Sequence, residues 1–250
     1  MKNMIRKIKK ASRNYESLLQ GLNIYVDREK IGLIRYAFDN VLRNPTSFAD
    51  LGGVWKVDAG YTIFTLKNYP IQKAFLVDTN YNDKVNSKLK KFSQLAKIEG
   101  NFALDSVIDK IERVDAVYFF DVLLHQVNPN WDVILEKYSA VSDCFVIYNQ
   151  QFIGAKRTIR LMDLPLDKYR ELAPRRKDGL YDFIHSHKEE INPEHNRPWK
   201  DIHNVWQWGI TDGDLRATMR RLGYREVYYK NWGRFSNLKA FENHAFIFKK

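Results

Sequence analysis

The sequence is poor in cysteine and has no long apolar run. Its one cysteine, Cys144, excludes an internal disulfide framework and a cysteine-rich zinc module. No apolar segment approaches the roughly 18 residues of a membrane-spanning helix, because the best candidate, residues 116–124, is interrupted by Asp121. The basic N-terminus is not followed by the apolar stretch of a signal peptide. We therefore expect a cytoplasmic protein without membrane spans.

Positive charge is in excess, with 41 lysines and arginines against 30 aspartates and glutamates and a net charge of +11. This balance favours acidic partners, such as nucleic acid, an anionic lipid surface or a phosphorylated small molecule. The basic residues are dispersed, with clusters at residues 2–13, 88–91, 175–177 and 216–221. Because most of them fit ordinary solvated helix faces, charge alone does not select the partner.

Short apolar segments of strand type alternate with polar segments of helical period. This alternation predicts βαβ units and a mostly parallel sheet flanked by helices. The expected strands are residues 47–53, 73–78, 97–102, 115–121, 143–149, 224–230 and 240–249. The expected helices are residues 83–95, 107–111, 129–138 and 211–221. Asn128 is the expected N-cap of the helix over 129–138, with Pro129 in its first turn.

Two segments depart from this alternation. In residues 1–45 apolar residues recur at spacings of three and four, as at Ile31 and Ile34, which predicts a helical cap. Residues 155–210 have no such period and hold four of the seven prolines and four of the six histidines. We therefore expect a cap followed by one domain, residues 46–250, that contains residues 155–210 as an insertion.

Polar residues follow the ends of the expected strands. The first strand ends in Asp50-Leu51-Gly52-Gly53, and the next strands end near Asp78, Asn101 and Asp121, with His125 just beyond. This order of motifs resembles the class I S-adenosylmethionine (SAM)-dependent methyltransferases over residues 45–154 and 211–250. The resemblance implies an α/β fold with a seven-stranded, mostly parallel sheet whose last strand is antiparallel. It also implies SAM as the cofactor, at the carboxyl ends of the first strands.

The resemblance implies a cofactor-binding role for each of these strand ends. Asp50 would accept a hydrogen bond from the ammonium group of SAM, and Asp78 would accept two from the ribose hydroxyls. The amide oxygen of Asn101 would accept one from adenine. The full expected set is Asp50, Gly52, Gly53, Asp78, Thr79, Asn101, Phe102, Phe120 and Asp121.

Some of these residues have ordinary structural alternatives. The two glycines also fit a simple tight turn, and Asp78 also fits a cap of the following helix. Val54 and Trp55 stand where the family has further small residues, so either the loop is longer or Trp55 closes over the ligand.

The resemblance places methyl transfer beside the turn after the fourth strand. Asp121, His125 and, from the insertion, His203 are the expected catalytic residues, since an imidazole can take up a proton near neutral pH. The alternative for His125 is a structural histidine of the core. We expect no metal site, because the histidines of the insertion lack a zinc-ligand spacing.

The insertion, residues 155–210, is expected to form a lid over the substrate. Its aromatic side chains offer flat apolar area, and its arginines can bind phosphate or carboxylate. Trp206 and Trp208 fit either a substrate wall or a hydrophobic plug. The expected substrate contacts are Tyr181, His185, Arg197, Trp206 and Trp208.

Together these features predict a SAM-dependent methyltransferase acting on an oxygen or nitrogen atom of a small anionic acceptor, such as a sugar, a glycan or a phosphorylated metabolite. An RNA methyltransferase is one alternative, although residues 121–124 replace the Asn-Pro-Pro-Tyr type motif of base methylation. A non-catalytic SAM-fold binding protein is another, suggested by the imperfect glycine loop.

Overall fold

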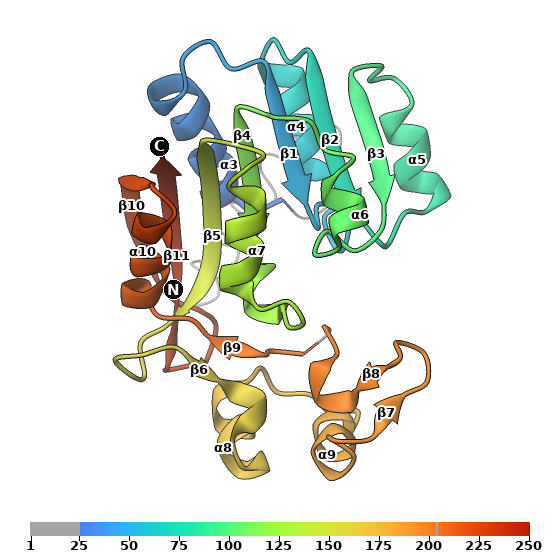
Figure 1. Cartoon of the computed structure of the whole chain (residues 1–250), viewed down its shortest axis with the longest axis vertical. Coiled ribbons are helices and arrows are strands. Elements are labelled where there is room, and N and C mark those ends of the chain that lie inside the picture. Colours follow the sequence, from blue (N-terminus) through green and yellow to red (C-terminus); the bar gives the residue numbers. More distant parts are fainter. Residues whose placement is uncertain (1–25, 204) are drawn as a thin grey trace, which may run out of the picture.

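The computed structural model describes residues 26–203 and 205–250, which form a sheet with helices on both faces (Figure 1). The sheet has seven strands in the order β10-β11-β5-β4-β1-β2-β3. Their bounds are β1 Ser47–Leu51, β2 Lys73–Asp78, β3 Leu95–Glu99, β4 Ala116–Phe120, β5 Cys144–Phe152, β10 Arg225–Arg234 and β11 Phe241–Lys249. The expected fold class is confirmed.

The order of the strands places the switch point of the sheet between β1 and β4. These two strands pair in parallel, as do β1 with β2, β2 with β3 and β4 with β5, whereas β11 is antiparallel to both β5 and β10. After β1, the chain adds β2 and β3 on one side of β1. It then crosses back and adds β4 on the other side. Ligands of open α/β sheets bind outside the carboxyl ends of the strands at such a switch point.

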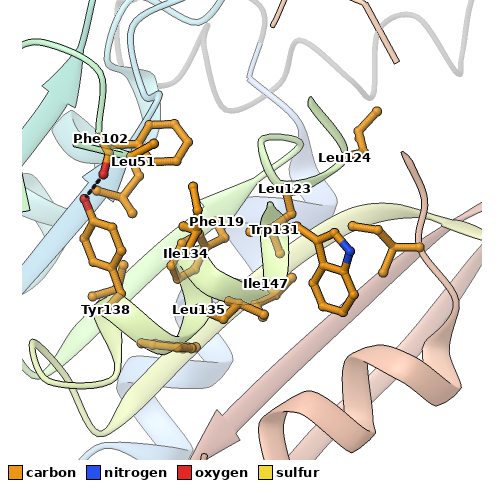
Figure 2. Close-up of a cluster of buried hydrophobic side chains, with 14 of the residues drawn as sticks. Leu51, Phe102, Phe119, Leu123, Leu124, Trp131, Ile134, Leu135, Tyr138 and Ile147 are labelled. Atoms are coloured by element: carbon orange, nitrogen blue, oxygen red, sulfur yellow. Dashed lines mark hydrogen bonds between the residues drawn. The ribbon is translucent and has the colours of Figure 1, made fainter. Parts of the chain in front are cut away.

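Alternating side chains of the strands build two cores. On β4, Val117 and Phe119 belong to one core, and Tyr118 and Phe120 to the other, as the period of two in a strand requires. The first core is covered by α7 Trp131–Tyr138, α6 Asp105–Ile108 and α10 Asp212–Arg221. Figure 2 shows α7 lying across this face of the sheet.

The second core is covered by α4 Gly60–Asn68 and by the described part of the N-terminal cap. There α3 Arg28–Tyr36 begins at the cap Asp27 and continues into the π-helix η1 Ala37–Val41. Ile31 and Ile34 are buried, as their spacing predicts. The rest of the predicted cap, including the basic cluster at residues 2–13, lies outside the described residues.

Several predicted boundaries are wrong, among them that of the strand expected over residues 97–102, which is β3 Leu95–Glu99, and that of the helix expected over 107–111, which is α6 Asp105–Ile108. The helix expected over residues 83–95 ends early, as α5 Asp83–Leu89, because the chain must turn to enter β3. The helix expected to begin at Pro129 is α7, whose N-cap is Asn130. Asn128 is not a cap, and its side-chain amide instead donates to Asp201 Oδ2 at 2.6 Å.

The insertion folds into short elements beyond the carboxyl ends of β4 and β5 (Figure 1). They are β6 Ile159–Arg160, η3 Leu161–Asp163, α8 Leu166–Leu172, α9 Leu180–Ser186, β7 Ile191–Asn192, β8 Arg197–Pro198, η4 Trp199–Asp201 and β9 Trp208–Gly209. Buried residues such as Tyr169, Ile184 and Val205 continue the first core into this segment. No helix within the described ranges is long and apolar enough to cross a membrane.

Candidate functional site

The carboxyl ends of β1 and β2 frame an open hollow of about 400 Å³. One wall is the loop after β1, with Val54, Trp55, Lys56 and Asp58, and the other is the segment after β2, residues 79–82. The volume lies in the range of roughly 300–1,000 Å³ that small-molecule sites occupy. Thr79 is the residue from the predicted cofactor set that lines this hollow.

The glycine turn after β1 is shaped by close packing. Gly52 has a φ of +73°, and a Cβ there would lie 2.8 Å from Val122 Cγ1. A Cβ at Gly53 would overlap the Asp50 carboxylate. The loop then extends to Ala59, the N-cap of α4, so it is longer than a simple glycine turn.

Asp78 fixes this loop to the end of β2. Its Oδ2 accepts the backbone N–H of Val54 at 2.8 Å and that of Trp55 at 3.2 Å, and its Oδ1 accepts that of Asn80 at 2.9 Å. Asp78 is 5% exposed, and both of its carboxylate oxygens already accept hydrogen bonds. Asp78 therefore holds the loop in place, and its role toward a ribose stays a prediction.

Asp50 is a buried carboxyl group whose charge depends on its surroundings. Its pKa is raised to about 7, chiefly by burial and also by the Asp78 carboxylate, and the Thr62 hydroxyl, which donates to Oδ2 at 2.6 Å, opposes the rise. A cation brought close to this group would favour its ionised form. This is the electrostatic condition for holding an ammonium group.

The predicted adenine contacts after β3 take part in local structure. The Asn101 side-chain oxygen accepts the N–H of Ala103 at 2.9 Å. Phe102 is buried, and its carbonyl accepts the Tyr138 hydroxyl of α7 at 2.8 Å (Figure 2). These bonds fix the loop after β3, and adenine binding by Asn101 and Phe102 remains a prediction.

At the end of β4, Asp121 lies in a polar cluster that the sequence analysis did not find. Its backbone has a φ of +57°, and its carboxylate accepts Gln150 Nε2 at 2.7 Å and the ammonium of Lys30 from α3. Lys30 is 7% exposed, with its ammonium 4.9 Å from the Tyr148 ring centroid. The sequence feature that could have indicated this cluster is Lys30, a lysine on the same face of α3 as its buried apolar residues.

Phe120, another predicted cofactor contact, precedes Asp121 and is largely buried. Its ring lies edge-on to Tyr61 of α4, with the centroids 5.2 Å apart, and stacks on Tyr118 at 5.3 Å. It thus joins β4 to the helix that begins after the glycine loop.

His125 ends the 3-10 turn η2 Leu123–His125, which the buried Leu123 and Leu124 anchor (Figure 2). Its Nδ1 lies 2.7 Å from the Val205 carbonyl. A carbonyl only accepts, so Nδ1 carries the hydrogen and Nε2 is the unprotonated nitrogen of the neutral ring. The geometry gives His125 a basic nitrogen with a fixed orientation.

Charges around His125 adjust its pKa in opposite directions. Burial is the main effect and lowers the pKa; the ammonium of Lys56 also lowers it, while the Asp121 carboxylate raises it. The imidazole is therefore neutral at neutral pH. These effects also show that Lys56 of the glycine loop and Asp121 of β4 both act on the same ring.

His203, the second predicted base, has both ring nitrogens engaged. Its Nε2 accepts Arg197 Nη1 at 2.6 Å, and its Nδ1 donates to the His125 carbonyl at 3.3 Å. Burial and then the Arg197 guanidinium lower its pKa to about 4. His203 thus supports the turn that carries His125 and has no nitrogen left for a substrate proton.

The two predicted tryptophan contacts join the insertion to the sheet. Trp206 is 8% exposed and lies edge-on to Phe241 of β11, with the centroids 4.7 Å apart. Trp208 Nε1 donates to the Gln126 carbonyl at 2.6 Å, directly after His125. For Trp206 these contacts are those of a hydrophobic plug.

The remaining predicted substrate contacts from α9 lie in the interior of the insertion. The Tyr181 hydroxyl donates to the Pro174 carbonyl at 2.8 Å, and its ring lies edge-on to Tyr169. The ring centroid of His185 lies 5.1 Å from that of Tyr169. Among the residues that the structure describes, no group of three or more histidine, cysteine, aspartate or glutamate side chains could hold a metal ion.

No known protein family matches the sequence, and no curated protein sequence is significantly similar to it. Solved structures are similar to it in fold. The Burkholderia thailandensis 1,6-didemethyltoxoflavin-N1-methyltransferase, solved with 1,6-didemethyltoxoflavin and S-adenosylhomocysteine, has a TM-score of 0.55 at 12% identity, over 89% of this chain and 77% of that one. The N-terminal domain of EvdMO1 with bound S-adenosylhomocysteine has a TM-score of 0.54 at 12% identity, over 89% and 79%.

A third similar structure is a putative SAM-dependent methyltransferase from Listeria monocytogenes, with a TM-score of 0.54 at 11% identity, over 88% of this chain and 99% of that one. The chain has the class I methyltransferase fold. On this class I fold the hollow, the Lys30–Asp121 cluster and His125 all follow the carboxyl ends of β1, β2 and β4.

Proposed function

We propose that the chain is a SAM-dependent methyltransferase that methylates an oxygen or nitrogen atom of a small anionic acceptor. The observation that carries the proposal is His125, a neutral imidazole at the end of β4 whose Nδ1–H is held by the Val205 carbonyl at 2.7 Å. On a class I methyltransferase fold, His125 would be a proton acceptor near the switch point of the sheet.

The residues around the glycine loop fit the cofactor. SAM, when bound, supplies a methyl group activated by its positively charged sulfur. Asp50 would hold the cofactor's ammonium group, since an adjacent cation stabilises the ionised form of a carboxyl group with a pKa near neutrality. The exposed polar side chains of Thr79 and Asn80 line the hollow and would meet the ribose, while Asp78 keeps the loop in place.

His125 would take the proton that the acceptor loses. As the acceptor's oxygen or nitrogen bonds to the methyl group, the bond between that methyl and the sulfur of SAM would break and leave S-adenosylhomocysteine. The acceptor's proton would pass to Nε2, and the ring would become an imidazolium. The Val205 carbonyl keeps the ring in position throughout, and the Asp121 carboxylate stabilises the new positive charge. Lys30 and Gln150 both donate to the Asp121 carboxylate and hold it in position.

Positive charge beside His125 supports an anionic acceptor. Lys56 lines the hollow, and its positive charge contributes to the lowered pKa of His125, while the Arg197 guanidinium is held by His203, which in turn is bonded to His125. These cations could pair with a phosphate or carboxylate of the acceptor. A sugar, a glycan or a metabolite carrying such a group is the substrate class that we propose.

Methyl transfer from isotope-labelled SAM to panels of acidic sugars, phosphorylated metabolites and total RNA tests the proposal. We expect label in a small anionic compound and calorimetric binding of S-adenosylhomocysteine. Label in RNA, with binding that falls steeply with salt, would instead show an RNA methyltransferase. Binding of S-adenosylhomocysteine without transfer to any panel would indicate a non-catalytic SAM-binding protein.

A further inference from the structure

Trp55 is a large apolar side chain that lines the hollow and is nevertheless 57% exposed. We propose that Trp55 is a stacking platform for the adenine ring of the cofactor, an inference that rests on the proposed function. The family resemblance assigns no role to this residue, because small residues are expected at its position. Three observations support this role: the hydrogen bonds that hold the loop, the exposure of the indole, and the polar residues across the hollow.

The loop presents Trp55 in a defined position. Its backbone N–H donates to Asp78 Oδ2 at 3.2 Å, beside that of Val54 at 2.8 Å. The following residues Lys56, Asp58 and Ala59 have positive φ angles of 63°, 47° and 61°. Non-glycine residues seldom adopt this conformation, and where they do it often marks a functional site. Trp55 is therefore an exposed tryptophan on a loop whose backbone conformation is well defined.

The indole of Trp55 is covered in part by a single cation and is otherwise largely exposed. The Lys56 ammonium lies 3.9 Å from the indole centroid. Across the hollow, Thr79 and Asn80, which would meet the ribose, and Asn82, which lies further along the same segment, are exposed and bear hydroxyl and amide groups. A flat ring with a polar edge, such as a nucleobase, would find an aromatic surface on one side and hydrogen-bonding groups on the other.

Trp232 provides a matched control for this surface. It is 37% exposed, and the Lys230 ammonium lies 3.5 Å from its ring centroid, which resembles the surroundings of Trp55. It belongs to β10, at the edge of the sheet opposite to β3, and does not line the hollow. The pair separates a binding role from the general effect of losing an exposed tryptophan.

The test is calorimetric binding of S-adenosylhomocysteine and of adenosine to the wild type and to Trp55→Ala, Trp55→Phe and Trp232→Ala. Removal of an aromatic side chain that stacks on a base costs about 5- to 150-fold in affinity. We expect Trp55→Ala to lose affinity by a factor in this range for both ligands, because both contain adenine. Trp55→Phe should lose less, since it keeps a ring, and Trp232→Ala should match the wild type.

Tryptophan fluorescence gives a second readout. Stacking of adenine should quench part of the emission in the wild type and in Trp232→Ala, and that part should be missing in Trp55→Phe. Equal affinities of Trp55→Ala and wild type for both ligands, with unchanged quenching in Trp55→Phe, would overturn the inference while leaving the proposed function intact. If the wild type binds neither ligand, the proposed cofactor is wrong, and the stacking role falls with it.

The same variants show whether the loop remains folded. Because Trp55 is more than half exposed, its replacement should leave the melting temperature within the range of Trp232→Ala. A large drop in the melting temperature of Trp55→Ala would make Trp55→Phe the deciding variant. Wild-type quenching and wild-type adenosine affinity in a well-folded Trp55→Phe protein would then count against stacking.

Discussion

A backbone carbonyl of the insertion decides which nitrogen of His125 is basic. With Nδ1–H bound to the Val205 carbonyl at 2.7 Å, only Nε2 can accept a proton. His125→Gln and His125→Ala should therefore lower methyl transfer by about 10²- to 10⁴-fold, the usual contribution of a general base. Binding of S-adenosylhomocysteine by calorimetry should stay near that of wild type.

The pH profile separates a base from a residue that only shapes the site. Burial lowers the pKa of His125 below its ordinary value of 6.5, so activity should fall as the pH drops through that lowered value and stay level above it. His195→Gln, at an exposed histidine of the insertion, is the matched control and should behave as wild type. Near-normal turnover of His125→Gln would show that no base is needed at this position.

The ionisation of Asp50, a buried carboxyl group, makes the free energy of unfolding depend on pH. Its pKa is about 7 in the folded protein against an ordinary 3.8, so the folded state holds the proton more tightly. The resulting stabilisation is complete below pH 3.8 and is lost as the pH rises through about 7. Asp50→Asn should remove this component, because an amide carries no charge and can still accept the Thr62 hydroxyl.

Thermal unfolding over this pH interval checks the prediction. The melting temperature of wild type should fall more than that of Asp50→Asn as the pH approaches and passes about 7. Parallel curves for the two proteins would show that Asp50 ionises normally. In that case Asp50 would lose the electrostatic reason for holding an ammonium group.

At the scale of elements, the sequence predicted what depends on local pattern. The strands around β1, β2 and β4, the helix α10 with its cap Thr211, and the antiparallel last strand are all present. These follow from hydrophobic period and from capping residues within a few positions. The predicted fold class is therefore confirmed, while the boundaries at β3 and α7 are shifted.

Features that depend on distant partners were not predictable. Lys30 is buried because Asp121, far along the chain, pairs with it. The insertion has no helical period because its short elements are held by tertiary bonds, as when the buried Gln207 side chain donates to the carbonyls of Lys200 and Ile202, each at 2.8 Å. Such contacts leave no trace in the spacing of apolar residues.

The bond between Trp208 and the Gln126 carbonyl connects β9 to the residue that caps η2. Trp208→Phe keeps an aromatic ring but removes the indole N–H that donates to this carbonyl at 2.6 Å. The loss of one such bond should lower the free energy of unfolding by about 0.5–1.5 kcal/mol. Because Gln126 follows His125, methyl transfer should fall while S-adenosylhomocysteine binding does not.

Chemical denaturation and single-turnover kinetics measure the two effects of Trp208→Phe. Trp199→Phe is the control, since Trp199 lies in η4 and its ring contacts Phe183 within the insertion. If both variants lose the same stability and neither loses activity, the bond from Trp208 merely anchors the insertion.

At the scale of the whole molecule, the inner part of the insertion is continuous with the sheet. Leu161, Met162 and Ile210 are buried in the same core as Phe119 of β4. Main-chain bonds also cross the boundary, since Gln207 N–H donates to the Leu124 carbonyl at 3.1 Å. The outer part, residues 174–200, has many exposed residues, so the segment contains two layers of different expected stability.

Hydrogen exchange tests whether the outer layer acts as the proposed lid. In the free protein, amides around Leu161 and Gln207 should be protected nearly as well as those of β4, whereas residues 174–200 should exchange faster because few of their backbone groups lie in the core.

Saturation with S-adenosylhomocysteine should add protection to the glycine loop and, if the outer layer closes over the site, to residues 174–200 as well. Residues 225–230 of β10, at the edge of the sheet opposite to β3, should not change and serve as the internal control. If residues 174–200 are already as protected as β4 and the ligand changes nothing there, the whole insertion is a structural layer of the sheet, and substrate access must be controlled by the loop that carries Trp55.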